Sequence, residues 1–188
     1  MIGVALAVSL VVYAGFLWLA HNRFVRTRQH LRESWSAIDV ELRRRYDLVP
    51  QLVAVVEGHG AHERRLLESV VAARATAAAS HGDHANQIRD EERLATALGD
   101  LLAVAESYPG LTADASFREL SDQLAATENR IAAARRFHNA NVREWRILGQ
   151  ALPWKVARPL VRWAPEPYFT VPPAVREASR AWRDGTAR

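Results

Sequence analysis

The first stretch of the chain is apolar at almost every position. Residues 2–20 contain no charged side chain, and Ser9 and Tyr13 supply their only side-chain polarity. As a helix, these nineteen residues extend about 28 Å, close to the hydrocarbon thickness of a bilayer. Because every face of such a helix is apolar, burial in a water-soluble core explains the pattern less well. We therefore predict a transmembrane anchor over residues 1–22.

A cleaved signal peptide is the competing interpretation of this segment. Against it, no Lys or Arg precedes the apolar run, the run is longer than usual for a signal peptide, and no small-x-small site precedes the polar flank. Four arginines follow the run, so the positive-inside rule predicts the N-terminus outside and the remaining chain in the cytoplasm. They are Arg23, Arg26, Arg28 and Arg32.

Beyond the anchor, apolar positions recur at intervals of three and four, which is typical of amphipathic helices. The spacing predicts one helix to about residue 46 and a second that Asp47 caps, with Pro50 in its first turn and a kink at Gly58 and Gly60. Residues 80–86 are predicted as a loop. A third helix is expected over about 87–107 and a fourth over about 117–149. Four helices with short connections predict an all-α fold, with an antiparallel up-and-down four-helix bundle over residues 23–152.

Residues 153–188 differ in kind, since six of the eight prolines fall between Pro153 and Pro173. A long helix is excluded there. The fourth helix of such a bundle returns to the anchored pole, so the basic and aromatic side chains of this tail are candidates for contact with lipid headgroups. These side chains are Trp154, Lys155, Arg158, Arg162 and Trp163. The alternative is a tail that only covers the end of the bundle, and the sequence does not separate the two.

The charge balance does not favour a nucleic-acid partner. The net charge is +4, but 25 basic and 21 acidic side chains alternate along the helical stretches, as on a solvated helix surface. Nucleic-acid-binding proteins usually segregate their positive charge onto one face. The chain has no cysteine, which excludes disulfides, a thiol nucleophile, a lipoprotein anchor and cysteine-based metal sites.

Candidate metal ligands occur at two places. His59 and His62 are three residues apart with Glu63 beside them, a spacing that can chelate a metal ion. No third and fourth ligands are evident, so residues lining a helix kink are the preferred interpretation. His81 and His84 share this spacing in the predicted loop. The alternative function is accordingly a metal-dependent enzyme or hydrolase subunit that uses His59, His62 and Glu63.

Charged side chains close to the apolar stripes of the first and fourth helices predict partly buried ion pairs that fix the helix register. These side chains are Asp39, Glu128, Arg130 and Arg135. A catalytic carboxylate needs a raised pKa, which a neighbouring arginine opposes. A structural role is therefore expected, and no phosphate-binding loop, nucleophile elbow or zincin motif occurs in the sequence.

The segment Trp35–Val53 resembles the signature segment of the LemA family, and Leu101–Pro109 and Thr127–Ala132 match further family segments in the same order. The resemblance implies a single N-terminal anchor, a cytoplasmic four-helix bundle and no established biochemical activity; some relatives act in magnetosome membrane formation. The motif residues to which it assigns structural roles are Trp35, Asp39, Arg44, Asp47, Pro50, His62, Glu63, Glu128, Asn129, Arg130 and Arg135.

These observations together predict a membrane-tethered scaffold or adaptor rather than an enzyme. Its expected partners are membrane lipid and proteins at the cytoplasmic face, with no nucleic acid and no cofactor.

Overall fold

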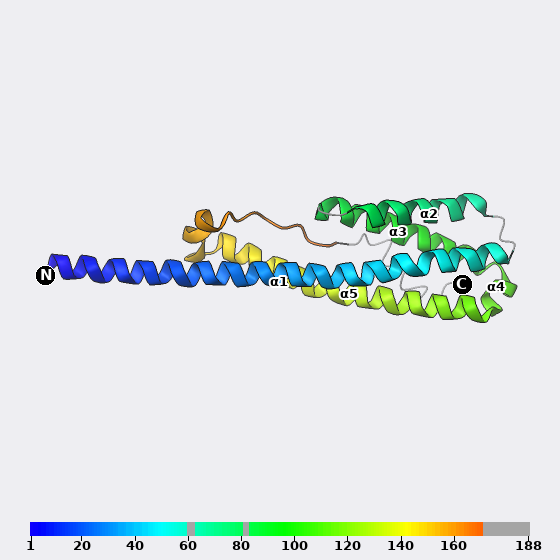
Figure 1. Ribbon diagram of the computed structural model, residues 1–188, viewed down its shortest axis with the longest axis horizontal. Coiled ribbons are helices and arrows are strands. Elements are labelled where there is room, and N and C mark those ends of the chain that lie inside the picture. Colours follow the sequence, from blue (N-terminus) through cyan, green and yellow to red (C-terminus); the bar gives the residue numbers. More distant parts are fainter. Residues whose placement is uncertain (60–62, 81–82, 171–188) are drawn as a thin grey trace. The chain divides into compact units, whose positions relative to one another are not determined.

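The computed structural model describes residues 1–59, 63–80 and 83–170, and every regular element in these ranges is helical. The elements follow one another along the chain as labelled in Figure 1. They are α1 (Ile2–Gly58), α2 (Arg64–Ala79), α3 (His84–Ala105), α4 (Pro109–Ala113), α5 (Ala115–Gln150) and a 3-10 helix, η1 (Trp154–Val161). The predicted all-α class is confirmed.

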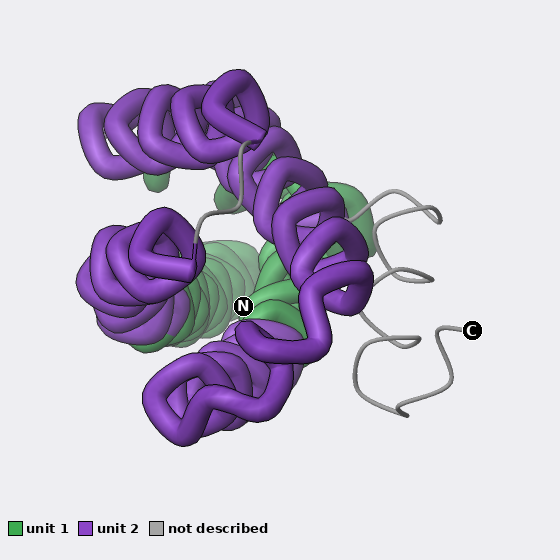
Figure 2. The backbone as a smooth tube through the Cα atoms, turned by 90° about the vertical axis from the view of Figure 1, so that its right-hand side faces the viewer, with its two compact units in different colours: residues 1–37, 134–168 green, residues 38–133, 169–188 purple. Residues whose placement is uncertain are grey.

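The chain divides into two compact units (Figure 2). Unit 1 consists of residues 1–37 and 134–168, so it contains the apolar N-terminal segment, the end of α5 and η1. Unit 2 consists of residues 38–133 together with the chain from Phe169 onward. Helices α1 and α5 are continuous and contribute one part to each unit.

The predicted helix start at Asp47 is wrong, because α1 continues through Pro50 to Gly58. Proline has no N–H to donate to the carbonyl oxygen four residues earlier, which here belongs to Tyr46. The Nε of Arg74 in α2 donates to that carbonyl oxygen at 2.8 Å. Since α2 supplies the missing donor, the helix can continue past the proline.

Two other boundaries differ from the expectation. The third predicted helix begins earlier, at His84, where the Asp83 carboxylate accepts hydrogen bonds from the backbone N–H groups of Ala85 and Asn86 at 2.9 and 3.4 Å. This N-cap shortens the predicted loop. The expected kink at Gly58 is the end of α1, and Arg64 begins a separate helix.

Apolar side chains from each long helix segment form the core of unit 2. Leu124 of α5 lies on the apolar stripe of that helix and is only 2% exposed. Apolar residues on the corresponding stripes of all four helix segments are also buried. They include Leu42, Val49 and Leu52 of α1, Val70 of α2, Leu94, Leu98 and Leu101 of α3, and Ile131 of α5.

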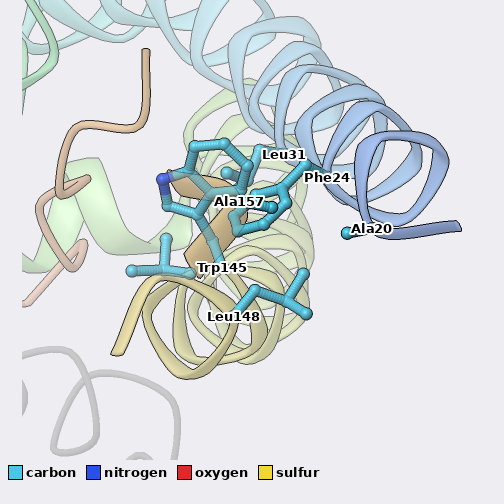
Figure 3. Packing of buried hydrophobic residues seen from close by; sticks show 7 residues of the cluster. Ala20, Phe24, Leu31, Trp145, Leu148 and Ala157 are labelled. Carbon is cyan, nitrogen blue, oxygen red and sulfur yellow. The ribbon is translucent and has the colours of Figure 1, made fainter. Parts of the chain in front are cut away.

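Aromatic packing dominates the core of unit 1 (Figure 3). The Phe24 ring of α1 meets the Trp145 ring of α5 edge-on, with 5.7 Å between centroids. The Trp145 indole N–H donates to the Ala164 carbonyl oxygen at 2.7 Å, and the Trp163 indole N–H donates to the Trp145 carbonyl oxygen at 3.0 Å. These bonds hold the chain after η1 against α5, so residues 153–168 are part of the fold of unit 1.

Candidate functional site

A buried charge network occupies the centre of unit 2. The Arg45 guanidinium of α1 is 2% exposed, and it donates to Glu128 of α5 at 2.7 Å and to Glu91 of α3. Glu91 is equally buried and also accepts from the Tyr46 hydroxyl, which lies 3.3 Å from the Ala77 carbonyl oxygen of α2. One cluster therefore joins side chains or backbone of four helices.

The network keeps Arg45 and Tyr46 in their ordinary charge states. Burial by itself lowers the pKa of Arg45, but the charges of Glu128 and Glu91 raise it above its usual value. Burial raises the pKa of Tyr46, and the charge of Glu91 and the hydrogen bond to it raise it further. A general acid or base needs to exchange its proton near the working pH. Arg45 stays charged and Tyr46 stays neutral, so this cluster is suited to positioning helices and not to proton transfer.

A second polar region lies in unit 1, where the tail meets the end of the apolar segment. The Trp154 ring stacks on Phe16 with 6.0 Å between centroids, and the Arg23 guanidinium lies 5.3 Å from the Trp154 ring centroid. The Trp163 ring stacks on Trp145 at 6.2 Å. Both tail indoles are therefore half-buried against protein, each with one guanidinium beside its ring.

The cationic side chains of this tail remain exposed. Arg158 lies over the Trp163 ring at 4.2 Å from its centroid, while Lys155 and Arg162 are exposed at the surface. Arg162 ends η1 in the left-handed backbone region, with φ 49° and ψ 48°. A non-glycine residue seldom adopts this conformation and requires support from the surrounding structure.

Comparison with known proteins identifies the chain. The sequence profile of the LemA family matches residues 34–181. The chain belongs to the LemA family. It is also similar to the magnetosome protein MamQ of Magnetospirillum gryphiswaldense, with 24% identity over 191 aligned positions, which cover 88% of this chain and 70% of the relative. The family match begins after the apolar segment, so the family match gives no information about that segment.

Several LemA motif residues contribute to the interior of their unit. Trp35 is half-buried and meets the buried His138 ring edge-on at 5.2 Å, and the Ser34 hydroxyl lies 3.0 Å from His138 Nδ1. Arg130 donates to Glu41 at 2.8 Å, which links α5 to α1. Asp39 pairs with Arg43 of its own helix at 2.8 Å.

Other motif residues lie at the surface. Arg44, Asp47, Pro50, Glu63 and Asn129 are exposed, and Arg135 is half-buried. His62 lies outside the described residues. The exposed set is not needed for the apolar core, which distinguishes it from residues such as Arg45.

The structure gives no support to the metal-dependent alternative. His59 Nδ1 lies 2.9 Å from the Val55 carbonyl oxygen, and its Nε2 lies 3.8 Å from Asp114. Among the described residues, no group of three or more His, Asp or Glu side chains is arranged to hold a metal ion. His62 and His81, which the sequence analysis paired with His59 and His84, are outside those residues.

Sequence reasoning missed the partners that matter most in unit 2. It named Glu128 but neither Arg45 nor Glu91, although both are buried. A signal was present, because Arg45 follows Leu42 by three positions and precedes Val49 by four, on the apolar stripe. A charge on that stripe points to a buried partner.

Proposed function

We propose that this LemA-family protein is a membrane-tethered scaffold or adaptor whose helical units lie in the cytoplasm and bind other proteins there. The observation that carries the proposal is the exposed apolar part of α1. Its 18-residue window has a mean hydropathy of 2.3 and is 0% buried. Exposed apolar area costs about 25 cal/mol per Å² in water, and a lipid bilayer removes that cost.

The orientation rests on charge. Arg23, Arg26, Arg28 and Arg32 all lie at the surface of α1 directly after the uncharged stretch. Their position favours retention of this flank in the cytoplasm, where arginine-rich flanks are enriched. The N-terminus is accordingly placed outside by this proposal.

The scaffold role rests on how the polar residues are used. The buried charges of unit 2 are committed to one another, whereas Arg44, Asp47 and Asn129 from the family segments are exposed. Exposed polar residues within a family signature are better explained by partner contact than by core packing. We therefore propose that this exposed set contributes to a protein-binding surface.

We further propose that unit 2 is an antiparallel up-and-down bundle of α2, α3 and the unit 2 parts of α1 and α5. The Arg45 and Tyr46 contacts with the other three helices support this arrangement. Because the chain has no cysteine, introduced pairs give unambiguous cross-links. A disulfide between cysteines placed at Ser80 and Asp90, whose side chains are hydrogen-bonded, tests the packing of the end of α2 on α3, with Ser80 and Arg118 as the unpaired control.

The tail is proposed to dock on the membrane surface beside the anchor. Lys155, Arg158 and Arg162 supply three exposed cations, and each contributes about 1 kcal/mol near an anionic leaflet. Trp154 and Trp163 are half-buried, so the apolar contact with lipid falls to the exposed Leu152, Val156 and Leu160.

Two measurements test the tether and its orientation. Alkaline carbonate should leave the full-length protein in the membrane pellet, and release into the supernatant would contradict the anchor. With Ser80→Cys, a membrane-impermeant thiol reagent should label the protein only after the cells are opened. Labelling of intact cells would reverse the proposed orientation.

The scaffold role needs a comparison of surfaces. Affinity capture from solubilised membranes should recover a specific protein with the wild type and lose it with Arg44→Ala, Asp47→Ala and Asn129→Ala combined. The matched control combines Arg64→Ala, Glu68→Ala and Arg89→Ala, which change exposed side chains of unit 2 outside the family segments. Equal recovery with both variants would contradict the proposed surface.

A further inference from the structure

A basic and apolar pocket lies within unit 1. Its volume is about 270 Å³, and side chains from α1, α5 and the end of η1 line it. Three of the lining residues are basic, five are apolar and none is acidic. They are His21, Phe24, Val25 and Arg28 of α1, Trp145 of α5, and Leu160, Val161 and Arg162.

The pocket begins where the uncharged stretch ends. Ala20 and Phe24 belong to one buried cluster, against which Phe16 and Leu17 also pack. His21 is the first residue after the uncharged run, and Arg28 lies about 12 Å farther along the helix axis than Ala20 at 1.5 Å per residue. The lining therefore extends from the edge of the proposed hydrocarbon layer through the depth of the headgroups.

The lining combines two kinds of recognition. The guanidinium groups of Arg28 and Arg162 are suited to phosphate oxygens, because their planar donors form paired, charge-assisted hydrogen bonds. The Phe24, Leu160 and Val161 side chains offer an apolar wall on the same hollow. A ligand that satisfies both must join an anionic phosphate to hydrocarbon.

The position of Arg162 indicates a built site. Its left-handed backbone, φ 49°, is held between η1 and a segment fixed by the bond from the Trp145 indole to Ala164. Strained backbone of this kind persists only where its surroundings determine it. The same Trp145 side chain lines the pocket, so the residue that holds the chain two positions after Arg162 is also part of the pocket wall.

We propose that this pocket binds one anionic phospholipid, with its phosphate held by Arg28 and Arg162 and the first part of its acyl chains against Phe24 and Leu160. The inference rests on the proposed membrane anchor, which brings the pocket to the lipid. Charge complementarity and continuity with the apolar stretch of α1 favour this occupant over a water-soluble phosphate. Bound lipid would fix the depth of the protein in the membrane.

The test uses the full-length protein in detergent, titrated with short-chain phosphatidylglycerol and followed by native mass spectrometry. Arg28→Gln with Arg162→Gln should weaken binding at least about tenfold, the loss expected when hydrogen bonds to a charged group are removed. Arg136→Gln with Arg143→Gln removes the same charge from exposed residues of α5 outside the pocket and the tail, and should change binding by less than about twofold, since these cations add only a nonspecific attraction. An equal loss with both pairs would overturn the pocket.

Two further ligands distinguish the sources of the phosphate. Phosphatidylcholine should bind at least about tenfold more weakly because it carries no net negative charge, and glycerol phosphate should bind still more weakly because it lacks acyl chains. Equal binding of either ligand would overturn the assignment to an anionic lipid. Val25→Trp fills part of the pocket without changing its charge, so it should also reduce binding, and unchanged binding would contradict an occupied hollow.

The pocket and the anchor fail separately. Carbonate release of the wild-type protein would refute the anchor whatever the lipid titration shows. If the wild type stays in the pellet and binds phosphatidylglycerol no better than the doubly substituted variant does, the pocket is wrong and the anchor stands.

Discussion

The two units bury polar side chains in different ways. In unit 2, Arg45 and Glu91 lie in the interior and form an ion pair with each other. In unit 1, the buried polar side chains are Thr27, Ser34 and His138, and the larger share of its core consists of Phe24, Trp145 and other apolar groups. Both interiors have apolar cores, and unit 2 also contains a buried ion pair.

This difference has a consequence for what each unit can bind. Buried charges are costly unless each has its partner in place, so the network of unit 2 specifies one arrangement of its helices. In unit 1, Arg146 donates to the Glu166 carbonyl oxygen, while Arg28 and Arg162 are exposed and line the pocket. The charges of unit 2 fix its helices, whereas these two cations of unit 1 are accessible to the proposed lipid.

The largest expected effect comes from breaking the network. Glu91→Ala leaves Arg45 buried with Glu128 as its remaining partner, and it should destabilise unit 2 by about 3–5 kcal/mol. Hydrogen exchange followed by mass spectrometry reads the two units separately. Glu144→Ala removes an exposed pair of unit 1 with a distance of 3.5 Å and should cost less than about 1 kcal/mol. Similar protection losses would abolish the contrast.

Apolar burial should not distinguish the units. Leu124 of unit 2 and Leu148 of unit 1 are 2% and 1% exposed, so replacement of either by alanine should cost about 2–5 kcal/mol. Exchange protection in the substituted unit is the measurement. If one of the two substitutions had no effect, the units would differ in how tightly their apolar side chains pack, and not only in which polar side chains they bury.

The apolar stripes were predictable because helix periodicity alone determines them. Leu42, Leu124 and Ile131 are buried as their spacing requires. The continuation of α1 through Pro50 was not predictable, since the donor that replaces the missing N–H comes from Arg74 in another helix. Local rules favour a helix start at a proline, and a distant contact overrides them here.

The candidate sites divide in the same way. The sequence indicated that charges near the stripes would pair, and the stripe contains Arg45, but the identity of its partners Glu91 and Glu128 depends on the register of three helices. The pocket was missed because it joins residues more than a hundred positions apart, from His21 to Arg162. No local pattern contains that information.

The charge state of Tyr46 gives unit 2 a pH dependence. Its pKa is raised in the folded protein, so below the unfolded value of about 10 both states are protonated and the stabilisation is complete. As the pH rises above about 10, the unfolded chain loses the proton first and stability falls by up to about 1.4 kcal/mol per pH unit. Tyr46→Phe should remove this part of the slope. An unchanged slope in alkaline urea titrations would show that burial and Glu91 do not raise the pKa of this hydroxyl.

A single methyl group should disturb unit 1. A Cβ added at Gly149 would overlap the Trp163 ring, whereas one added at Gly110 would meet nothing within 4 Å. Gly149→Ala should cost about 1–3 kcal/mol and expose the tail to limited proteolysis after Lys155 or Arg162, since overpacking displaces the ring. Gly110→Ala is the control. Equal proteolysis of both variants would mean that the tail does not depend on this contact.

The smallest predicted effect concerns a side chain that donates to a helix carbonyl oxygen, which occurs in both units. In unit 2 the Arg74 guanidinium donates to the Tyr46 carbonyl oxygen, and in unit 1 the Trp163 indole donates to the Trp145 carbonyl oxygen. Only the first acceptor lacks its helical donor, because Pro50 has no N–H. Arg74→Met should therefore cost about 1 kcal/mol in the natural sequence, the usual contribution of one hydrogen bond.

A double-mutant cycle separates this bond from other roles of Arg74. Pro50→Ala restores the backbone N–H, so Arg74→Met should cost little in that background, and the coupling energy should reach at least about 0.5 kcal/mol. Urea midpoints of the four proteins provide the measurement. If Arg74→Met costs the same in both backgrounds, the guanidinium acts through packing, and the continuity of α1 past Pro50 needs another cause. If the cycle couples as expected, a charged side chain of unit 2 replaces a missing backbone donor, whereas the indole of unit 1 adds to a carbonyl that already has one.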